Sequence, residues 1–579
     1  MQLSPSAHAD TFCRDNLPPE ELWPQLRFDL PELHYPDRLN CAAALLDYAV
    51  AELGPDQPCL RSPADAWSYG ELLTRSNQVA RVLTEDLGLV PGQRVLLRGP
   101  NNPWLAACWF GVLKAGGVAV TTMPLLRSAE LADLVGLTRS TVLLCDHRFV
   151  AELAAAAPGL PLVAFGDGGP SGLAARCAGK SATFANVETA ADDVAILATT
   201  SGTTGKPKAT MHFHRDILAI ADTFAQHVLQ PRPADVFAGT PPLAFTFGLG
   251  GLLVFPLRVG ASVLLVEKAT PAELADAIHD HAVTVVFTAP TAYRTMLRAG
   301  KADRLRGLRR GVSAGEHLPK AVWEEFHQAT GVRLIDGIGT TEMLHIFVSA
   351  AADDVRPGAT GRPVPGYQVA VLGPDGTPVP DGTPGRLAVT GPTGCRYLND
   401  PRQAAYVENG WNITGDTFIR DADGYFWYQA RSDDMIVSSG YNIGAPEVER
   451  ALEAHPDVAE CAVVGRPDDE RGMIVHALVV LRDGVTGDAA KVAELQAFTR
   501  TLIAPYKYPR SMEFIAALPR TATGKVQRFA LRSTAETQPR DLGIRNDLSL
   551  SNIAGFLRTF KKRYIHNDSQ EVSGKCASR

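Results

Sequence analysis

The chain lacks the cysteine pattern of a disulfide-bonded or zinc-binding protein. Its nine cysteines are scattered over 579 residues, without a CxxC pair and without a cluster with histidine. This distribution favours reduced thiols over disulfides or a zinc site. We therefore expect a cytoplasmic protein without a structural metal.

The chain also lacks a dominant charge and a long apolar run. Its 56 Lys and Arg against 63 Asp and Glu argue against a nucleic-acid partner. Pro256 and Arg258 interrupt the longest apolar stretch, and the N-terminal segment has no basic flank followed by an apolar core. We expect neither a membrane span nor a secretory signal.

What the chain does have is a segment suited to a polyphosphate, TTSGTTGKPKA at 199–209. Glycines let the backbone approach phosphate oxygens, while hydroxyl and ammonium groups supply donors and positive charge. The segment provides all three kinds of group in Thr200, Ser201, Gly202, Thr203, Thr204, Gly205, Lys206 and Lys208. It predicts that the chain binds a nucleoside triphosphate.

The spacing of this segment excludes a Walker A loop. That loop has four residues between its glycines and a Ser or Thr after the lysine, whereas here two residues separate the glycines and Pro207 follows Lys206. An apolar run, VAILATT, precedes the segment, and a stretch of helical periodicity, HRDILAIADTFAQHVL, follows it. We expect the loop to join a strand to a helix.

The alternation of short apolar and amphipathic runs predicts an α/β fold. RVLLRGPNN, PWLAACWFGVLKAGG and VAVTTM read as strand, helix and strand of a mainly parallel sheet. Gly and Pro between 356 and 394 separate alternating segments typical of β-hairpins. We predict a large domain over 1–431, a small α+β domain over 432–535 and an extension of uncertain structure over 536–579.

Further motifs follow in a fixed order: GTTE at 339–342, TGD at 414–416, ARSDD at 430–434, SSGYNIGAPEVE at 438–449 and PRTATGKVQR at 519–528. In this order they resemble the adenylate-forming superfamily of acyl-CoA synthetases, peptide-synthetase adenylation domains and beetle luciferases. The resemblance covers roughly residues 10–535. It implies that ATP and a carboxylate form an acyl adenylate, with release of pyrophosphate, and that a thiol then accepts the acyl group.

Other stretches resemble the benzoate-CoA ligase group. SAHADTFCRDNLPP, LPELHYPDRLN and DGIGTTEMLHIF carry this likeness, and the first of them most resembles 2-aminobenzoate (anthranilate) CoA ligases. The resemblance implies an AMP-forming aryl-CoA ligase that uses ATP, Mg²⁺ and coenzyme A. Benzoate or 2-hydroxybenzoate as the acid, and a carrier protein as the acceptor, stay open as alternatives.

The resemblance also implies which residues bind the nucleotide. Glu342 would bind the Mg²⁺ that bridges the phosphates, and Thr341 would bond the α-phosphate; one carboxylate plus substrate phosphates is a usual magnesium site. Asp416 would accept both ribose hydroxyls, and Arg431 would reach the ribose or a phosphate. The remaining predicted nucleotide-binding residues are Ala314, Gly315, Glu316, Asp336, Gly337, Ile338 and Gly339.

The predicted small domain would serve the two half-reactions with different residues. Lys525, in TATGKVQR, would stabilise charge between the incoming carboxylate and the α-phosphate. The resemblance places the family's hinge at Asp433, and such element-terminal residues absorb the backbone change of a domain rotation. Gly440 and Tyr441 are expected to line the tunnel for the pantetheine arm.

The predicted aryl pocket contains Phe245 as an aromatic gate and His345 with Ile346 beside the ring, together with Ala314, Gly315 and Gly339. An ortho amine or hydroxyl would need a polar partner, and His345 is the candidate. For His212 and His214 we expect a structural role, since the substrate carboxylate is already ionised and adenylation needs no general base.

Residues 536–579 continue past the lysine motif, where relatives usually end. Ile553, Phe556, Leu557, Phe560 and Tyr564 have helical spacing, with KKR at 561–563. We expect a helix on the protein's own surface or a disordered tail. A homodimer is left open. A non-catalytic nucleotide-binding module would be expected to lack Lys525, Glu342 or Asp416, and a luciferase-like oxygenase has no positive feature here.

Overall fold

The computed structural model describes residues 3–63, 65–201, 207–431 and 435–519, together with Val526 and Leu531. The chain divides into two units, Met1–Arg528 and Phe529–Arg579. Only Leu531 of the second unit is described, so the predicted helix at 553–564 lies outside the described residues. The expected domain boundary at residue 431 stays a prediction.

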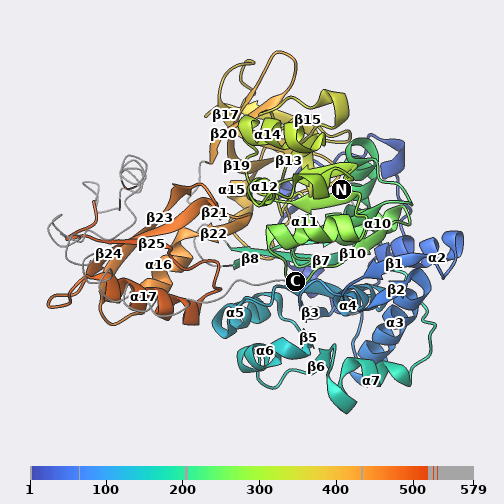
Figure 1. Ribbon diagram of the computed structural model, residues 1–579. Coiled ribbons are helices and arrows are strands. Elements are labelled where there is room, and N and C mark those ends of the chain that lie inside the picture. Colours follow the sequence, from blue (N-terminus) through green and yellow to red (C-terminus); the bar gives the residue numbers. More distant parts are fainter. Residues whose placement is uncertain are drawn as a thin grey trace, which may run out of the picture. The chain divides into compact units, whose positions relative to one another are not determined.

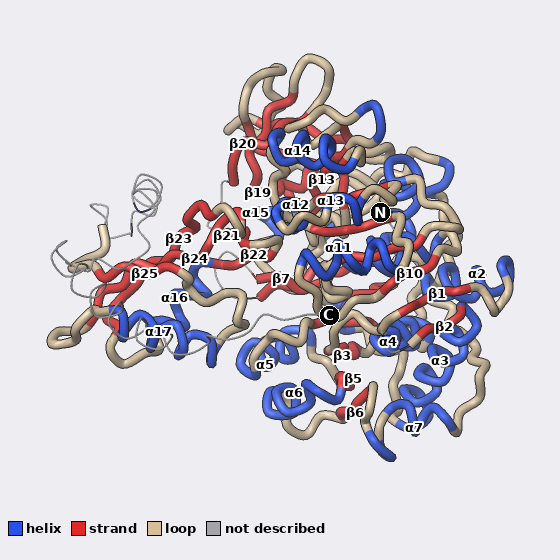
Figure 2. The backbone as a smooth tube through the Cα atoms, viewed as in Figure 1, coloured by secondary structure: helices blue, strands red, loops and turns tan. Residues whose placement is uncertain are grey.

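Two large sheets, mainly parallel, form the framework of the first unit (Figures 1 and 2). The nine-stranded sheet has the order β15-β14-β13-β12-β11-β9-β10-β1-β2. Its strands from β13 to β1 run parallel, and the outer pairs β13–β14, β14–β15 and β1–β2 are antiparallel. The strands are β1 Pro58–Arg61, β2 Ala66–Ser68, β9 Val236–Gly239, β10 Ser262–Leu264, β11 Val285–Thr288, β12 Arg310–Ser313, β13 Leu334–Gly339, β14 Ile346–Ser349 and β15 Arg362–Pro363.

The six-stranded sheet has the order β6-β5-β3-β4-β7-β8 and is parallel except for the pair β7–β8. The predicted strand–helix–strand unit is confirmed here, because α4 connects the parallel neighbours β3 and β4. The strands are β3 Arg94–Arg98, β4 Val118–Thr122, β5 Val142–Asp146, β6 Leu162–Phe165, β7 Val194–Ser201 and β8 Pro207–Phe213.

Helices cover both sheets, as expected for parallel sheets whose strands are apolar on both faces. One face of the nine-stranded sheet packs on α11, α12 and α14 through Ile278, Tyr293 and Phe326, and these helices lie together in Figure 1. Helices α5 and α6 pack on the outer face of the six-stranded sheet. The largest core, which contains α3 and α4, joins the facing sides of the two sheets.

The helices of this framework are α1 Phe12–Asp15, α2 Tyr48–Leu53, α3 Tyr69–Arg81, α4 Pro103–Lys114, α5 Ser128–Thr138, α6 Val150–Ala156, α7 Leu173–Ala178, α8 His214–Ile220, α9 Thr246–Leu249, α10 Phe255–Arg258, α11 Pro271–Asp280, α12 Pro290–Arg298, α13 Ala302–Leu305, α14 Lys320–Thr330 and α15 Gln403–Tyr406. The helix that starts with α8 continues as a π-helical segment over Ala221–Leu229.

Smaller sheets follow along the chain, as the hairpin pattern and the later α+β pattern predict, and they are antiparallel except for the pair β24–β25. The five-stranded sheet contains β16 Gln368–Leu372, β17 Gly385–Thr390, β18 Val407–Glu408, β19 Trp411–Arg420 and β20 Phe426–Arg431. The next element along the chain is the hairpin of β21 Met435–Ser438 and β22 Tyr441–Gly444. The last described elements are α16 Ala445–Glu453, β23 Val458–Asp468, β24 Gly472–Leu481, α17 Ala489–Leu502 and β25 Ser511–Phe514.

One local expectation was wrong: the phosphate loop does not lead directly into a helix. It connects β7 to the antiparallel strand β8, and α8 begins only at His214. Residues 209–213 are buried throughout, so the stretch shows no alternating pattern that would mark it as a strand. Its strand conformation comes from pairing with β7, in which Leu197 lies opposite Met211.

No helix in the described part of the chain is long and apolar enough to cross a membrane. The eight cysteines in the same part are buried and unpaired.

Candidate active site

A cavity of about 600 Å³ lies at the carboxyl ends of strands from both large sheets. Thr121, Thr122 and Met123 reach it from the end of β4, and Thr240 follows β9. Ala289 follows β11 in the same way. In open parallel sheets, ligands bind in the crevice outside the carboxyl ends of the strands. The cavity therefore has the position expected of a binding site.

The cavity brings together residues predicted from widely separated motifs. Those that line it are Thr200, Phe245, Ala314, Gly315, Gly339, Thr341, His345, Ile346, Gly440 and Tyr441. Six other predicted residues do not line it: Glu316, Asp336, Gly337, Ile338, Glu342 and Asp416. The roles assigned to both groups stay predictions.

The phosphate loop itself lies largely outside the described residues. Nothing is described for Gly202, Thr203, Thr204, Gly205 and Lys206, and nothing for the side chain of Ser201. At the base of the loop, Thr200 pairs in register with Lys208 across β7 and β8. The Thr200 hydroxyl is buried and has no hydrogen-bond partner among the described residues. A donor in that state suits a ligand oxygen.

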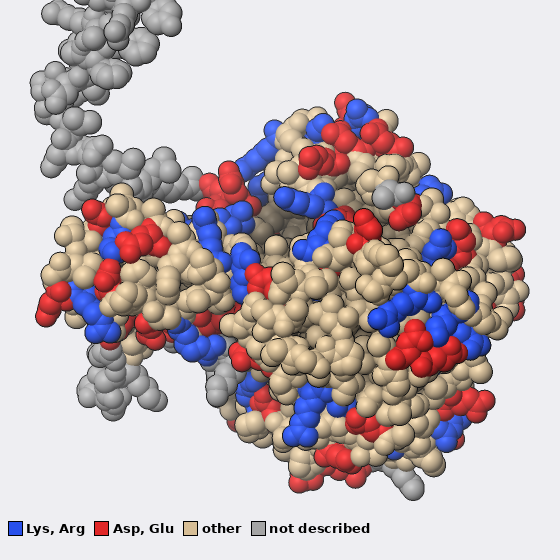
Figure 3. Space-filling model, turned by 90° about the horizontal axis from the view of Figure 1, so that it is seen from below, with Lys and Arg blue, Asp and Glu red and all other residues tan. Residues whose placement is uncertain are grey.

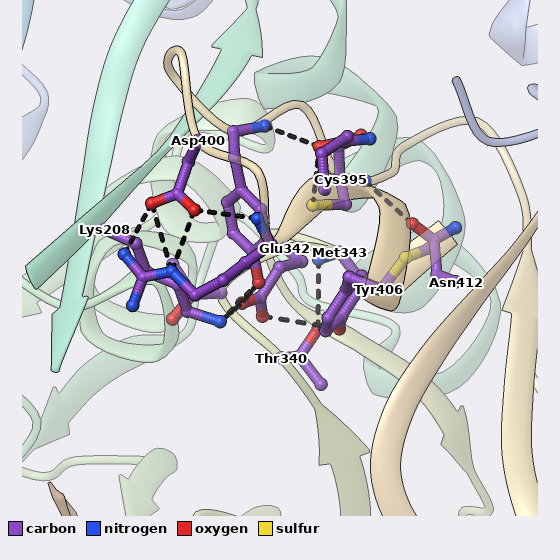
Figure 4. A network of polar contacts seen from close by, with 12 residues as sticks. Lys208, Thr340, Glu342, Met343, Cys395, Asp400, Tyr406 and Asn412 are labelled. Atoms are coloured by element: carbon purple, nitrogen blue, oxygen red, sulfur yellow. Dashed lines mark hydrogen bonds and ion pairs between the residues drawn. The ribbon is translucent and has the colours of Figure 1, made fainter. Parts of the chain in front are cut away.

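A polar network holds Glu342 beside the cavity (Figure 4). Nζ of Lys208 lies 2.9 Å from Glu342 Oε1, and the Tyr397 hydroxyl donates to the same oxygen at 2.5 Å. The Tyr406 hydroxyl lies 3.4 Å from Oε2 and 3.2 Å from the hydroxyl of Thr340. The carboxylate of Glu342, which follows β13, is thus contacted by side chains from β8 and from the segments that carry the two tyrosines.

Glu342 is held in its ionised form. Burial by itself opposes ionisation, but the Lys208 ammonium and the Tyr397 hydroxyl lower the pKa of Glu342 to about 2. A buried ionised carboxylate is the ligand type that a hard divalent cation prefers. The residues present therefore fit the Mg²⁺ that the resemblance implies.

His212 supports the backbone next to Glu342. Its Nε2 lies 2.8 Å from the carbonyl oxygen of Thr341, and as a donor to that carbonyl it carries the proton on Nε2. The side chain is buried, and its Nδ1 lies 3.7 Å from Oδ2 of Asp216. Asp216 also forms an ion pair with Arg396. His214 is also buried, and burial lowers its pKa to about 3. These contacts agree with the structural role expected for both histidines.

The part of the cavity predicted to hold the ring is aromatic. The ring centroid of His345 lies 4.6 Å from that of Phe255 and 5.7 Å from that of Phe247. Burial lowers the pKa of His345 to about 3, so the imidazole is neutral. Neither ring nitrogen forms a hydrogen bond of good geometry to a described residue. An aromatic region that contains a neutral imidazole is thus available to a ligand.

Asp416 lies in β19 and Arg431 is the last residue of β20, both in the five-stranded sheet. They are register partners across these two strands, and the Arg431 side chain lies outside the described part. Asp416 is buried, and its N–H donates to the hydroxyl of Thr414 at 3.3 Å. Asp336 is buried as well, and burial holds its pKa well above the ordinary range.

The predicted pantetheine residues lie in a tight turn. Ser439 and Gly440 connect β21 to β22 with φ of +49° and +80°, as in the type I′ turn that joins many two-residue hairpins. The Gly440 N–H donates to Glu316 Oε1 at 2.6 Å. Tyr441 stacks on Tyr506 at 4.4 Å and meets Phe245 edge-on at 6.0 Å. The expected hinge Asp433 and the expected catalytic Lys525 lie outside the described residues.

Comparison with known families agrees with this arrangement. The AMP-binding enzyme family matches residues 48–396, and the AMP-binding enzyme C-terminal domain matches 447–525. The first match alone covers more than half of the chain. The chain belongs to the AMP-binding enzyme family. Its mixed α/β architecture, with parallel sheets followed by a small C-terminal domain, is the fold of that family.

Several characterised AMP-binding enzymes are similar over nearly their whole length. The benzoate–CoA ligase of Thauera aromatica is 36% identical over 514 residues, which cover 87% of this chain and 97% of the relative. The structure of the anthranilate CoA ligase AuaEII with anthranoyl-AMP is 32% identical, with a TM-score of 0.68 and coverages of 88% and 99%. A benzoate CoA ligase structure from Burkholderia xenovorans LB400 is 33% identical, with a TM-score of 0.65 and coverages of 85% and 100%.

Some residues of this AMP-binding enzyme's site were not among those predicted. Tyr397 and Tyr406 contact Glu342 from positions 55 and 64 residues away along the chain, and no motif marks them. Lys208 was noted for its charge, but its contact with Glu342 was not foreseen. Phe247 lines the cavity two residues after Phe245, and the repeated aromatic in AFTFG was the only signal that could have indicated it.

Proposed function

We propose that this AMP-binding enzyme is an ATP-dependent aryl-CoA ligase whose preferred acid carries an ortho amine, as in 2-aminobenzoate. The observation that carries the proposal is His345 in the aromatic part of the cavity. Its ring is buried and neutral, and its nitrogens have no well-formed bond to a described residue. An unpaired buried polar group is costly, and a substrate amine would offset that cost.

The cavity supports an aromatic rather than an aliphatic acid. Phe245, Phe247 and Ile346 line it together with His345, and aromatic side chains pack against a flat ring in offset or edge-on geometries. Gly250 keeps this arrangement in place, because a Cβ there would lie 2.4 Å from His345 Cδ2. The relatives named above act on benzoate and anthranilate, which agrees with this substrate class.

In the first half-reaction the acid's carboxylate would attack the α-phosphate of ATP and release pyrophosphate. This chain's residues would position the reactants and balance charge. Thr200, Thr341 and the phosphate loop would bind phosphate oxygens, and Asp416 with Arg431 would bind the ribose. Glu342 would hold Mg²⁺, which when bound supplies positive charge to the phosphates.

In the second half-reaction the thiol of coenzyme A would attack the acyl carbonyl and release AMP. Gly440 and Tyr441 would line the path of the pantetheine arm. A carrier protein bears the same pantetheine thiol and is the alternative acceptor. Comparing turnover with coenzyme A and with a phosphopantetheinyl carrier protein distinguishes the two, and we expect coenzyme A to be preferred.

The substrate test measures pyrophosphate release with 2-aminobenzoate, benzoate, 2-hydroxybenzoate and a short fatty acid. We expect 2-aminobenzoate to give the highest kcat/KM and the fatty acid the lowest. Benzoate as the best substrate would keep the aryl-CoA ligase and remove the ortho-amine preference. A fatty acid as the best substrate would overturn the aryl assignment.

A further inference from the structure

A second cavity, of about 420 Å³, opens at the other end of the strands that lead to the candidate active site. Arg310 begins β12 and Arg333 precedes β13, and both line this cavity together with Arg306, Arg309 and Asp353. The carboxyl end of β13 leads to Thr340 and Thr341 in the first cavity. At about 3.3 Å per residue, the six-residue strand β13 separates the two cavities by roughly 20 Å.

The second cavity, here called the arginine cavity, has an excess of positive charge. Its lining contains four arginines and one aspartate. Arg309 forms an ion pair with Asp235, Arg306 with Asp303 and Arg333 with Asp353. Arg232 is a further cation close enough to affect Arg310. These five arginines against three aspartates leave two positive charges, in a chain whose net charge is −7.

This local excess is opposite in sign to the composition of the chain, in which 63 Asp and Glu outnumber 56 Lys and Arg. On the face shown in Figure 3, basic and acidic side chains are interspersed, and no large area carries one sign. An uncompensated group of arginines in a cavity is therefore a local feature and does not follow from the overall composition. Like charges held together raise the free energy of the folded protein unless an anion offsets them.

Arg310 is the arginine of the cavity lining that has no ion pair with a carboxylate of the described residues. Its Nε donates to the carbonyl oxygen of Leu229 at 3.2 Å and its Nη1 to that of Arg309 at 3.4 Å. Among the described residues it forms no ion pair. Burial together with Arg309 and Arg232 lowers its pKa, although Asp235 acts in the opposite direction. Nη1 of the adjacent Arg309 is buried and has no described hydrogen-bond partner. The lining thus includes a guanidinium whose charge no carboxylate of the described residues neutralises in an ion pair.

We propose that the arginine cavity binds a phosphate dianion, either free or as a phosphate monoester. Two negative charges would balance the excess left by the ion pairs. The planar guanidinium group presents paired N–H donors that match two phosphate oxygens. The volume also exceeds that of a phosphate group and lies within the range of small-molecule sites, which leaves room for the remainder of a monoester.

Isothermal titration calorimetry on the full-length protein tests this site, with inorganic phosphate and ribose 5-phosphate as probes and chloride as the buffer anion. We expect Arg310→Gln and Arg333→Gln each to weaken binding by about tenfold or more, because a hydrogen bond to a charged group contributes about 1.5–3 kcal/mol. The matched control is Arg298→Gln, an exposed arginine at the end of α12 that does not line the cavity.

The Arg333 variant keeps the test independent of folding. The side chain of Arg333 is 46% exposed and its partner Asp353 is 97% exposed, so its loss should change stability little. Tighter binding of ribose 5-phosphate than of phosphate indicates a monoester site, and the reverse order indicates a site for free phosphate. Unchanged isotherms in both cavity variants would overturn the proposal. Citrate binding as tightly as phosphate would overturn the assignment to a phosphoryl group.

Discussion

Nζ of Lys208 lies 2.9 Å from Oε1 of Glu342, in an ion pair that joins β8 to the segment following β13. The pair also contacts Tyr397, whose hydroxyl donates to the same carboxylate oxygen. In this AMP-binding enzyme the proposed metal ligand is therefore oriented by a strand that begins directly after the phosphate loop.

Replacing Glu342 by Gln tests whether this carboxylate serves the ATP-dependent step. We expect ATP–pyrophosphate exchange to fall by about a hundredfold or more, because an amide cannot supply the negative charge that a metal ligand provides. Formation of thioester from supplied aryl-AMP and coenzyme A should change little. The exposed Lys320, replaced by Gln, serves as control, and equal losses in both half-reactions would contradict the assignment.

Replacing Lys525 by Ala tests the catalytic lysine implied by the TATGKVQR motif. We expect adenylation to fall by about 10³ to 10⁵, the range measured for cations that act on phosphoryl transfer. Conversion of supplied aryl-AMP to thioester should persist, since that step involves no attack on phosphorus. The measurement is exchange against thioester formation in the same preparation, with exposed Lys268→Ala as control. A lysine without this role would leave exchange intact.

Gly440→Leu tests the predicted pantetheine path. Gly440 has φ of +80°, and a Cβ there would lie 3.5 Å from Ala289 Cβ, so a leucine would project into the cavity. We expect thioester formation to fall by about a hundredfold, with ATP–pyrophosphate exchange largely retained. Gly484→Leu is the matched control, because that glycine also has positive φ but has open space around it. Loss of exchange in Gly440→Leu alone would point instead to a role in adenylation.

Glu316→Gln tests a pH effect on stability. Burial raises the pKa of Glu316 from 4.5 to about 7, although the Gly440 and Thr291 groups favour its ionised form. The unfolded chain thus releases this proton at lower pH than the folded protein does. The free energy of unfolding should therefore fall as pH rises from about 4.5 to about 7 and stay level above that range.

The Gln variant lacks this ionisation. We expect its stability to match the wild type near about pH 4 and to exceed it by at most about 3 kcal/mol near about pH 8. Chemical unfolding at both pH values measures the difference, and replacement of the exposed Glu325 by Gln provides the control. A difference independent of pH would show that Glu316 ionises alike in both states.

His345→Phe tests the proposed ortho-amine preference. The substitution keeps an aromatic ring beside Phe255 but removes both nitrogens. We therefore expect the ratio of kcat/KM for 2-aminobenzoate to kcat/KM for benzoate to fall about tenfold. This is the effect expected for the loss of one hydrogen bond. His345→Asn, which retains polar atoms, should restore part of the ratio. An unchanged ratio in the Phe variant would remove His345 from substrate selection.

The sequence predicted elements well where the local pattern and the tertiary environment agreed. The strand–helix–strand unit of β3, α4 and β4 is one case, since its strands are buried on both faces and read as continuous apolar runs. Strand β8 is the opposite case: it carries no strand-like alternation, and its conformation depends on pairing with β7. The helix predicted after the loop exists, but it begins only after β8.

The candidate active site also combines residues that the sequence predicted with contacts that it did not predict. Motif order alone grouped Thr200, Thr341, His345 and Gly440, and all four line one cavity. The partners of Glu342 could not be predicted, because Tyr397 and Tyr406 lie far away in sequence and belong to no recognised motif. Their contact depends on how the segment before β19 packs against the end of β13.

By itself the sequence determined the type of fold through the period of its apolar residues, and a triphosphate ligand through the composition of the phosphate loop. The class of chemistry followed from the resemblance of its ordered motifs to the adenylate-forming superfamily. Only the tertiary structure decided which groups act on one another. It placed Lys208 and two tyrosines on Glu342, enclosed His345 in phenylalanines, and gathered arginines from two strand ends into a second cavity. Such contacts depend on the order of strands in the sheets, which no local pattern encodes.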